Sequence, residues 1–398
     1  MMVVLYNPHV DDFLAEPPHY RLLKRRPLRK YGFFIDESLR KGQAVNVLVD
    51  GTSSAFISER VFHKLPQFLR WFVSEVEYKI WLRINRFGTL VRRVQAPKEK
   101  SDGVLLAFSY KSATGDFALR RNVLTQYRAV VFHLSHYFVL TKEKSENIKT
   151  LDNAWLAGDS DIRDIDYFKH FFSWYKKEFL VLPFAVSPRF CLKKKYSERQ
   201  NRCVATGSFH DLTQEQPPEK YVDYLCATQS TTYHPIRKEI YDQAASVKSL
   251  VESKISPYRK YGQSSKLKRL IGHFLVAQKK YFSIDIVDLY NDYRFAVVGE
   301  ELPGFPALGA FEAMACGCTL IADKQYYKGL GLAQNEHYIN YEGTLNSLLM
   351  TITTQQTNGS DQIVTAGANF ITSRFSPVAV FQEWNSVISR VQPDKPDA

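Results

Sequence analysis

Two aspartates with one residue between them follow a short apolar run in the first half of the sequence. The run Ala154–Ala157 has the length of a buried strand, and the residues after it, GDSDI, include Asp159 and Asp161. At the carboxyl end of a parallel strand, a side chain reaches the crevice where ligands bind. Either aspartate could act there as a general base on a hydroxyl group, or as a nucleophile. The alternative is an Asp/Ser loop that caps a helix beginning near Asp164.

A histidine and an arginine three residues apart form a second candidate site. In the sequence TTYHPIRK, His234 and Arg237 could both face a phosphate and give it charge-assisted hydrogen bonds. The alternative is a helix that begins at Pro235 and carries surface cations. Ser208 and His210 lie in a loop after another apolar strand, where backbone N–H groups often approach a phosphate. These residues predict an anion site in the second half of the chain.

The segment from Tyr293 to Ala322 has the pattern of a strand, a turn, a helix and a second strand. Its turn is rich in Gly and Pro, and its helix stops at Gly317. A helix N-terminus presents free N–H groups and the positive end of the helix dipole, which suits a phosphate. The residues around this helix start are Pro306, Ala307, Leu308, Gly309 and Ala310. The alternative is a tightly packed crossover in which the small residues serve packing alone.

Two series of short apolar runs alternate with helical patterns, which is typical of parallel-sheet α/β proteins. The first series is Val3–Tyr6, Val45–Val49, Val104–Tyr110, Val130–Leu134 and Ala154–Ala157, and the second is Cys203–Thr206, Ile284–Val287, Phe295–Val298 and Thr319–Ala322. A proline-containing segment and a charged stretch separate the two series. We therefore predict domains at residues 1–187 and 188–376, and a terminal helix with a polar tail at 377–398.

The sequence FEAMACGCTLIA closely resembles the helix-and-strand segment of GT-B glycosyltransferases, which have two Rossmann-like domains with a cleft between them and use nucleotide-sugar donors. In that family, the loop and the helix start bind the donor phosphates, so the resemblance implies this role for the helix start described above. The family's helix glutamate, which contacts the sugar or ribose, corresponds to Glu312. A second family glutamate, eight residues earlier, is replaced by Gly304, and the nearby acids are Glu300 and Glu301. The sugar-contacting pair is therefore not reproduced.

Further resemblances concern the donor and the connections between the domains. The His-Pro dipeptide at His234 and the sequence LGAFEAMA resemble features of CMP-sugar GT-B enzymes, among them the Kdo transferases of capsule and lipopolysaccharide assembly. Those enzymes also have an acidic residue in a loop of the N-terminal domain. Asp159 or Asp161 would correspond to that residue. LVLPFAVSPRF resembles the entry into the donor domain, and Val378–Val391 is placed like the helix that returns to the N-terminal domain. This resemblance favours CMP-Kdo over a UDP- or GDP-hexose donor.

Other polar residues have structural alternatives. His133 and His136 flank Ser135 at the end of a predicted strand. They could line the acceptor side of the cleft, or they could be histidines of the core. We expect Glu336 to be structural. The sequence DSD also matches the metal-binding motif of GT-A enzymes, but no other ligand cluster accompanies it, so we expect no metal. We also expect no cofactor apart from the nucleotide-sugar substrate.

Composition and charge limit the possible partners. The chain has 398 residues, a net charge of +12 and a pI near 9.2, so its partner is an anion: a nucleic acid, an acidic membrane surface or a phosphorylated small molecule. The basic runs Arg21–Lys30 and Lys254–Lys280 read as solvated helix faces, and the second could instead dock on lipid headgroups. There is no apolar stretch of membrane-spanning length, and five scattered cysteines fit a reducing cytoplasm. We expect a cytoplasmic protein with peripheral contact at the inner membrane face.

The leading hypothesis is therefore a metal-independent glycosyltransferase that acts on a glycan or glycolipid acceptor. A nucleic-acid-binding protein is the alternative from another class, but the sequence has no recognisable motif for nucleic-acid binding. Its basic runs also lack the interleaved aromatic residues that stack on bases. A non-catalytic protein with the same fold is a third reading. The polar tail PDKPDA could begin a linker, so the chain could be one module of a larger protein.

Overall fold

The computed structural model describes residues 2–19, 29–57, 59–108, 110–113, 117–134, 142–209, 224–225, 228, 230–257, 284–358 and 361–391. The chain divides into two compact units. Unit 1 comprises Met1–Gly158, Phe171–Leu182 and Val380–Ala398, and unit 2 comprises Asp159–His170 and Pro183–Ala379. The domain boundary predicted from the sequence lies at residue 187. The division between the two units falls after Leu182, and it also assigns the earlier segment Asp159–His170 to unit 2.

Unit 1 is built on a seven-stranded parallel sheet with the order β3-β2-β1-β4-β5-β6-β7. The strands are β1 (Val3–Tyr6), β2 (Val45–Leu48), β3 (Val91–Val94), β4 (Ser101–Ala107), β5 (Tyr127–His133), β6 (Ala154–Gly158) and β7 (Leu180–Val181). The central strands are almost continuously apolar because helices cover both faces of a parallel sheet. The sequence did not predict β3, an edge strand whose two arginines, Arg92 and Arg93, interrupt the apolar pattern.

The regular helices of unit 1 are α2 (Phe33–Arg40), α3 (Glu59–Phe62), α4 (Gln67–Ile84), α5 (Phe117–Leu124) and α6 (Lys142–Lys149), and its short 3-10 turns are η1 (Pro8–Val10) and η2 (Tyr110–Ala113). Helices α7 (Asp166–Phe172) and α16 (Pro377–Arg390) cross the division between the units. Within unit 1, fully buried Trp384 of α16 packs against Phe33 and Phe34 of α2, with ring centroids 5.2 and 5.5 Å apart. This aromatic contact places the end of α16 in unit 1 although it is distant in the sequence.

Unit 2 has a five-stranded parallel sheet with the order β12-β11-β10-β8-β9. The strands are β8 (Gln200–Phe209), β9 (Val251–Pro257), β10 (Tyr293–Val297), β11 (Thr319–Ala322) and β12 (Ile339–Asn340). One predicted strand, Ile284–Val287, is wrong. The carboxylate of Asp285 accepts hydrogen bonds from the amides of Val287 (2.9 Å) and Asp288 (3.2 Å), so a helix begins there instead.

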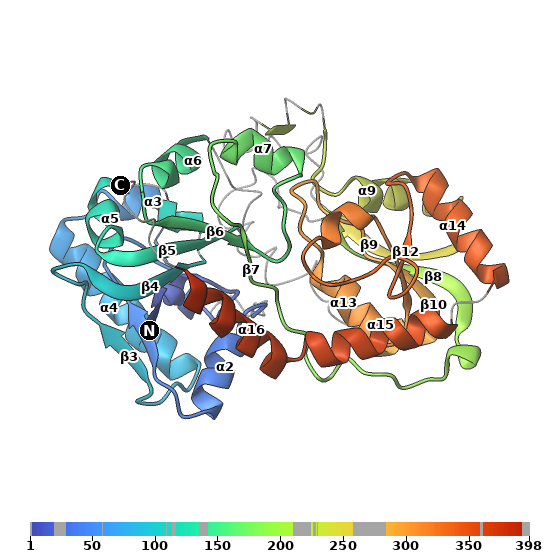
Figure 1. Ribbon diagram of the computed structural model, residues 1–398, viewed down its shortest axis with the longest axis horizontal. Coiled ribbons are helices and arrows are strands. Elements are labelled where there is room, and N and C mark those ends of the chain that lie inside the picture. Colours follow the sequence, from blue (N-terminus) through green and yellow to red (C-terminus); the bar gives the residue numbers. More distant parts are fainter. Residues whose placement is uncertain are drawn as a thin grey trace, which may run out of the picture. The chain divides into compact units, whose positions relative to one another are not determined.

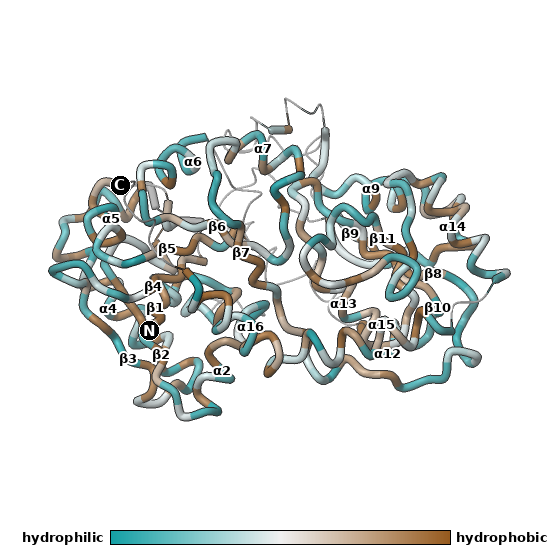
Figure 2. Tube along the Cα trace, viewed as in Figure 1, coloured by the Kyte–Doolittle hydropathy of each residue, from teal (hydrophilic) through white to brown (hydrophobic). Residues whose placement is uncertain are grey.

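Helices cover both faces of the unit 2 sheet (Figure 1). On one face α9 (Pro235–Asp242) contacts α14 (Leu345–Asn358), and on the other α12 (Ile286–Asp292) and α15 (Asp361–Arg374) contact α13 (Leu308–Ala315). The unit also contains the 3-10 turns η4 (Tyr196–Glu198) and η6 (Lys324–Tyr327). The core under α9 and α14 is formed by alternate residues of β8 and β10 together with apolar side chains of the two helices. Figure 2 shows hydrophobic segments along the strands of the sheet.

The two basic runs lie mostly outside the described residues. The first part of the second run, from Lys254 to Pro257, is strand β9 and not a solvated helix face. It pairs with β8 over its whole length, and only Val251 and Ile255 of the strand are buried. The charged side chains between these two positions hid the strand from prediction. Over the residues that the structure describes, no helix is both long and apolar enough to cross a bilayer.

Candidate active site

The candidate site lies where the strand order of unit 2 reverses. β8 leads through α9 to β9 on one side, whereas β10 leads through α13 to β11 on the other. In sheets of this kind the ligand crevice is expected at the carboxyl ends of the two strands where the order reverses, here β8 and β10. Arg237 bridges these two strand ends. Its guanidinium donates to the carbonyl oxygens of Ser208 (2.8 Å), Val298 (2.6 Å) and Gly299 (2.8 Å). Three residues that were predicted to bind the nucleotide-sugar donor, His234, Arg237 and Ser208, therefore lie close together.

The glycines at this crevice allow the bridge. Gly299 has φ +66°, and a Cβ atom on it would lie 2.9 Å from Cγ of Arg237. Gly207 has φ +119°, and a Cβ atom there would lie 3.0 Å from Nε of the same side chain. Larger residues would displace the guanidinium. Arg237 therefore fixes the two strand ends, and a direct contact between it and a phosphate stays a prediction.

His234 is the N-cap residue of α9, and Pro235 is the first residue of that helix, as the sequence predicts for a helix start. The Nε2 atom of His234 lies 3.3 Å from Oε1 of Glu301, and the guanidinium of Arg237 lies 3.8 Å from the same oxygen. Both cationic candidates therefore share one carboxylate in the turn after β10. Glu301 is visible in the sequence as an acid after a strand, but no local signal pairs it with His234 and Arg237.

Glu300 connects turns at the carboxyl ends of neighbouring strands of the unit 2 sheet. Its side chain is buried, and it accepts hydrogen bonds from the amide of Asp323 (2.9 Å) and from the hydroxyl of Tyr341 (3.1 Å). Burial raises the pKa of Glu300, whereas the hydrogen bonds that it accepts favour the ionised form and lower the pKa. Burial is the larger effect, and the pKa is about 7. The carboxyl group is therefore close to half-protonated near neutral pH. The sequence offered one signal for it, an acid directly after a buried strand.

The turn between β10 and α13 is tightly packed. Gly304 has φ +100°, and a Cβ atom on it would lie only 2.7 Å from Cγ1 of Ile165. Pro303 and Pro306 of this turn are buried, whereas Ala307 and Leu308 at the helix start are partly exposed. The N-cap residue is Ala307, whose side chain has no polar group with which to cap the helix. Gly309 packs near the Tyr290 hydroxyl, so its small size serves packing.

Glu312 lies one turn further along α13 and is partly exposed. Burial raises its pKa to about 7, although the nearby Arg189 lowers it. It can therefore exchange a proton or donate a hydrogen bond near neutral pH. The resemblance assigns contact with the sugar or ribose to this residue, and that role stays a prediction.

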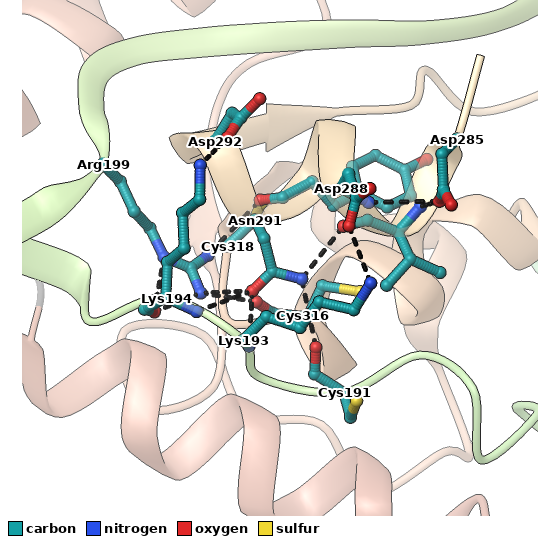
Figure 3. Close-up of polar contacts among 12 residues, drawn as sticks. Cys191, Lys193, Lys194, Arg199, Asp285, Asp288, Asn291, Asp292, Cys316 and Cys318 are labelled. Atoms are coloured by element: carbon teal, nitrogen blue, oxygen red, sulfur yellow. Dashed lines mark hydrogen bonds and ion pairs between the residues drawn. The ribbon is translucent and has the colours of Figure 1, made fainter.

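The C-terminal end of α13 is anchored by a buried arginine. The guanidinium of Arg199 donates to the carbonyl oxygens of Cys316 (2.7 Å) and Gly317 (2.8 Å), at the negative end of the helix dipole. It also donates to Oδ1 of Asn291 at 3.0 Å, an atom that accepts a further bond from the amide of Lys193 at 2.7 Å (Figure 3). This cluster fixes the direction of α13 and therefore the position of its N-terminus.

A cavity of about 520 Å³ lies in unit 2 beside this edge of the sheet. It is lined by Asp161, Asp164 and Ile165 on one side, and by η6 and the loop after it, including Lys324, Tyr327, Lys328 and Tyr338, on the other. Ile165 also contacts the Gly304 turn, so the cavity adjoins the turn that leads into α13. An ion pair between Lys328 and Asp164 and a hydrogen bond of 3.0 Å from the Asp161 amide to the Lys328 carbonyl hold the two sides together.

The two predicted catalytic aspartates differ in accessibility. Asp159 is fully buried, whereas Asp161 lines the cavity. Burial raises the pKa of Asp161, but hydrogen bonds from Arg163, including one of 2.7 Å from its guanidinium, outweigh that effect and lower the pKa overall. Asp161 is therefore ionised at neutral pH and is the better placed of the two to meet a ligand. The arginine also makes it a weaker base.

The remaining candidates lie elsewhere. His133 is buried in unit 1, where its Nε2 atom is 2.9 Å from the carbonyl oxygen of Leu182 and its ring stacks on Trp384, as expected of a core histidine. Glu336 is an exposed loop residue. Ser135, His136 and His210 are outside the described residues. Among the residues that the structure does describe, no three His, Cys, Asp or Glu side chains are arranged to hold a metal ion.

Comparison with known proteins identifies the fold. No protein-family model matches the chain, and no curated protein matches its sequence. Among solved structures, sucrose-phosphate synthase from Thermosynechococcus elongatus is similar over 98% of this chain and 99% of its own, with 12% sequence identity and a TM-score of 0.53. The Anabaena protein HepE in complex with UDP-glucose is similar over 98% of this chain and 100% of its own, with 12% identity and a TM-score of 0.51. The protein has the GT-B fold. The predicted fold class is therefore confirmed.

Proposed function

We propose that this GT-B protein is a glycosyltransferase that moves a sugar from a nucleotide-activated donor to a glycan or glycolipid acceptor. The observation that carries the proposal is the cluster of Ser208, His234, Arg237 and Glu301 at the reversal point of the unit 2 sheet, in a fold shared with sucrose-phosphate synthase. In such a sheet the reversal point is where a nucleotide binds. The uncapped N-terminus of α13 would then stabilise the departing phosphate.

The residues divide the chemical work as follows. We place the donor phosphates beside Arg237, which is positively charged, and His234, which is charged when protonated; Glu301 lies next to both side chains. Glu312, with a pKa of about 7, can bind a hydroxyl of the sugar or ribose as donor or as acceptor. Asp161 is ionised and lines the neighbouring cavity, so it is the residue we assign to the acceptor hydroxyl or the anomeric carbon. Asp159 would support it from the buried side.

The finer proposal is that the donor is CMP-Kdo and the product belongs to a lipopolysaccharide or a capsule. The His-Pro dipeptide at the start of α9, next to the proposed phosphate site, supports this choice. A UDP-hexose is the second candidate, because HepE binds UDP-glucose in a structure of the same fold. A peripheral contact with the inner membrane face would accompany a lipid-linked acceptor.

Two measurements test the proposal. The first is a thermal-shift assay with CMP, UDP and GDP, since a ligand that binds the folded state raises its melting temperature. Stabilisation by CMP supports the Kdo donor, stabilisation by UDP or GDP alone overturns it in favour of a hexose, and no stabilisation by any nucleotide overturns the transferase. The second is transfer or hydrolysis of the donor by Asp161→Asn, for which we expect a loss of about 100-fold or more. Asp288→Asn, at an exposed ion pair with Lys193, is the matched control.

A further inference from the structure

Helix α4 of unit 1 exposes a row of apolar side chains on its outward face. Its buried residues are Ser74, Glu77, Tyr78 and Trp81, so polar and aromatic groups both point inward. Its exposed apolar residues, with the exposed fraction of each, are Phe68 (70%), Leu69 (36%), Trp71 (39%), Phe72 (65%), Val76 (39%) and Ile80 (36%). Four of these are spaced four residues apart and therefore share one face of the helix. The outward face of a helix on the surface of a water-soluble domain is normally polar, so this row is unusual.

The buried polar residues explain why the helix is oriented in this way. The carboxylate of Glu77 accepts hydrogen bonds from the hydroxyl of Ser54 (2.6 Å) and from the amides of Ala55 (2.7 Å) and Phe56 (3.1 Å). The hydroxyl of Ser74 donates to the carbonyl of the neighbouring loop at 3.0 Å. Since unpaired buried groups of this kind are costly, these bonds fix the face of α4 that points inward. They also hold Phe56, which is 44% exposed, next to the helix.

We call the resulting surface the α4 patch, and define it as Phe56, Phe68, Leu69, Trp71, Phe72, Val76 and Ile80. The charge of the segment that contains α4 is one-sided. Residues 59–100 contain ten Lys and Arg but four Asp and Glu. Of the acids, Glu77 is buried and Glu75 forms ion pairs with Lys79 (3.4 Å) and Arg93. Lys79 and Arg83 are both exposed and lie about two and three turns beyond Phe72 along α4.

We propose that the α4 patch docks on an anionic phospholipid bilayer. The phenylalanines would enter the boundary between headgroups and acyl chains, and Lys79 and Arg83 would contact the lipid phosphates. A bilayer surface of this kind offers an apolar layer and a negative one side by side, which is the arrangement that the patch complements. A helix of 18 residues with five charged side chains lies on a membrane and does not cross it. The proposal does not require the transferase activity.

The test is sedimentation of the full chain with vesicles of equimolar phosphatidylglycerol and phosphatidylcholine, compared with vesicles of phosphatidylcholine alone. We expect binding to the anionic vesicles that falls with added salt. The double variant Phe68→Ser/Phe72→Ser should bind about tenfold more weakly or worse, because it loses the insertion of two large apolar side chains. Lys79→Gln/Arg83→Gln should lose the preference for anionic lipid. Leu192→Ser/Met350→Ser, which alters residues of unit 2 that are 60% and 71% exposed, should bind like the wild type.

Each contrary result has a defined meaning. Failure of the wild-type protein to sediment with anionic vesicles overturns the proposal, and so does equal binding by Phe68→Ser/Phe72→Ser. Size-exclusion chromatography provides the second arm. A wild-type dimer that becomes a monomer in that variant, without a change in vesicle binding, would show that a second copy covers the patch. Circular dichroism shows whether each variant is folded, and the pair Trp71→Ser and Ile80→Ser replaces the double variant if that does not fold.

Discussion

The carboxylate of Glu300 accepts a hydrogen bond of 2.9 Å from the backbone amide of Asp323, which joins the turn after β10 to the turn after β11. The same carboxylate accepts a bond from the Tyr341 hydroxyl at 3.1 Å. Two adjacent strand ends at the candidate site therefore depend on one buried acid.

Burial of Glu300 predicts that stability falls as the pH rises. Its pKa in the folded protein is about 7 and its ordinary value is 4.5, so the neutral form is favoured by folding. Its contribution is fully present below pH 4.5 and is lost as the pH rises through 7. The loss amounts to about 3 kcal/mol. Glu312, with the same pKa of about 7, should add to it.

The measurement is the urea midpoint of unfolding, followed by circular dichroism on the acidic and the alkaline side of the Glu300 pKa. Glu300→Gln should show a weaker dependence on pH than the wild type, because glutamine stays neutral. Its amide oxygen can accept from the Asp323 amide, and its amide nitrogen can donate to the Tyr341 oxygen. Glu342→Gln changes an exposed glutamate and should behave like the wild type. Parallel curves for Glu300→Gln and the wild type would mean that Glu300 does not titrate as its burial implies.

Replacement of the buried Arg199 should destabilise unit 2. Replacing it with alanine leaves the carbonyl oxygens of Cys316 and Gly317 without its guanidinium in a buried environment. We expect Arg199→Ala to destabilise unit 2 by about 3 kcal/mol or more. Since α13 would no longer be fixed at its C-terminus, stabilisation by the bound nucleotide should also decrease.

The matched control for this arginine is Lys193→Ala. Lys193 forms an exposed ion pair of 2.7 Å with Asp288 in the same cluster, and such pairs contribute about 0–1 kcal/mol. Thermal unfolding with and without nucleotide compares the two variants. An Arg199→Ala protein as stable as Lys193→Ala would refute the anchoring role.

The sequence predicted much of the fold because short apolar runs bounded by turn residues mark buried parallel strands. Val3–Tyr6 and Thr319–Ala322 were predicted with the bounds that the structure has. β9 was missed because it is an edge strand with charged residues between its two buried positions. Ile284–Val287 was misread as a strand because its apolar residues outweighed the capping pattern of Asp285.

The candidate site was predictable only in part. The residues Ser208, His234 and Arg237 could be chosen because each follows a strand or opens a helix. The bridge that Arg237 makes from Ser208 to the turn after β10 could not be inferred, since it depends on the positive φ of Gly299. The packing of Asp159–His170 in unit 2 likewise depends on contacts such as the one between Asp161 and Lys328, which are distant in sequence and carry no local signal.

Gly304 should tolerate no side chain, for two separable reasons. Its φ of +100° is strained for any L-residue, and an added Cβ atom would lie 2.7 Å from Cγ1 of Ile165. We expect Gly304→Ala to destabilise unit 2 by more than about 2 kcal/mol and to weaken nucleotide binding, because the turn that leads into α13 must shift.

Two other glycines separate these effects. Gly42 has φ +68° with open space around it, so Gly42→Ala should cost about 1 kcal/mol for the backbone alone. Gly88 has neither a positive φ nor a neighbour within 4 Å, so Gly88→Ala should change stability by less than about 0.5 kcal/mol. Thermal unfolding measures the order of the three variants. Adding Ile165→Ala to Gly304→Ala should restore part of the stability relative to the sum of the two single changes, because it makes room for the methyl group. Additive losses would show that contact with Ile165 does not constrain the turn.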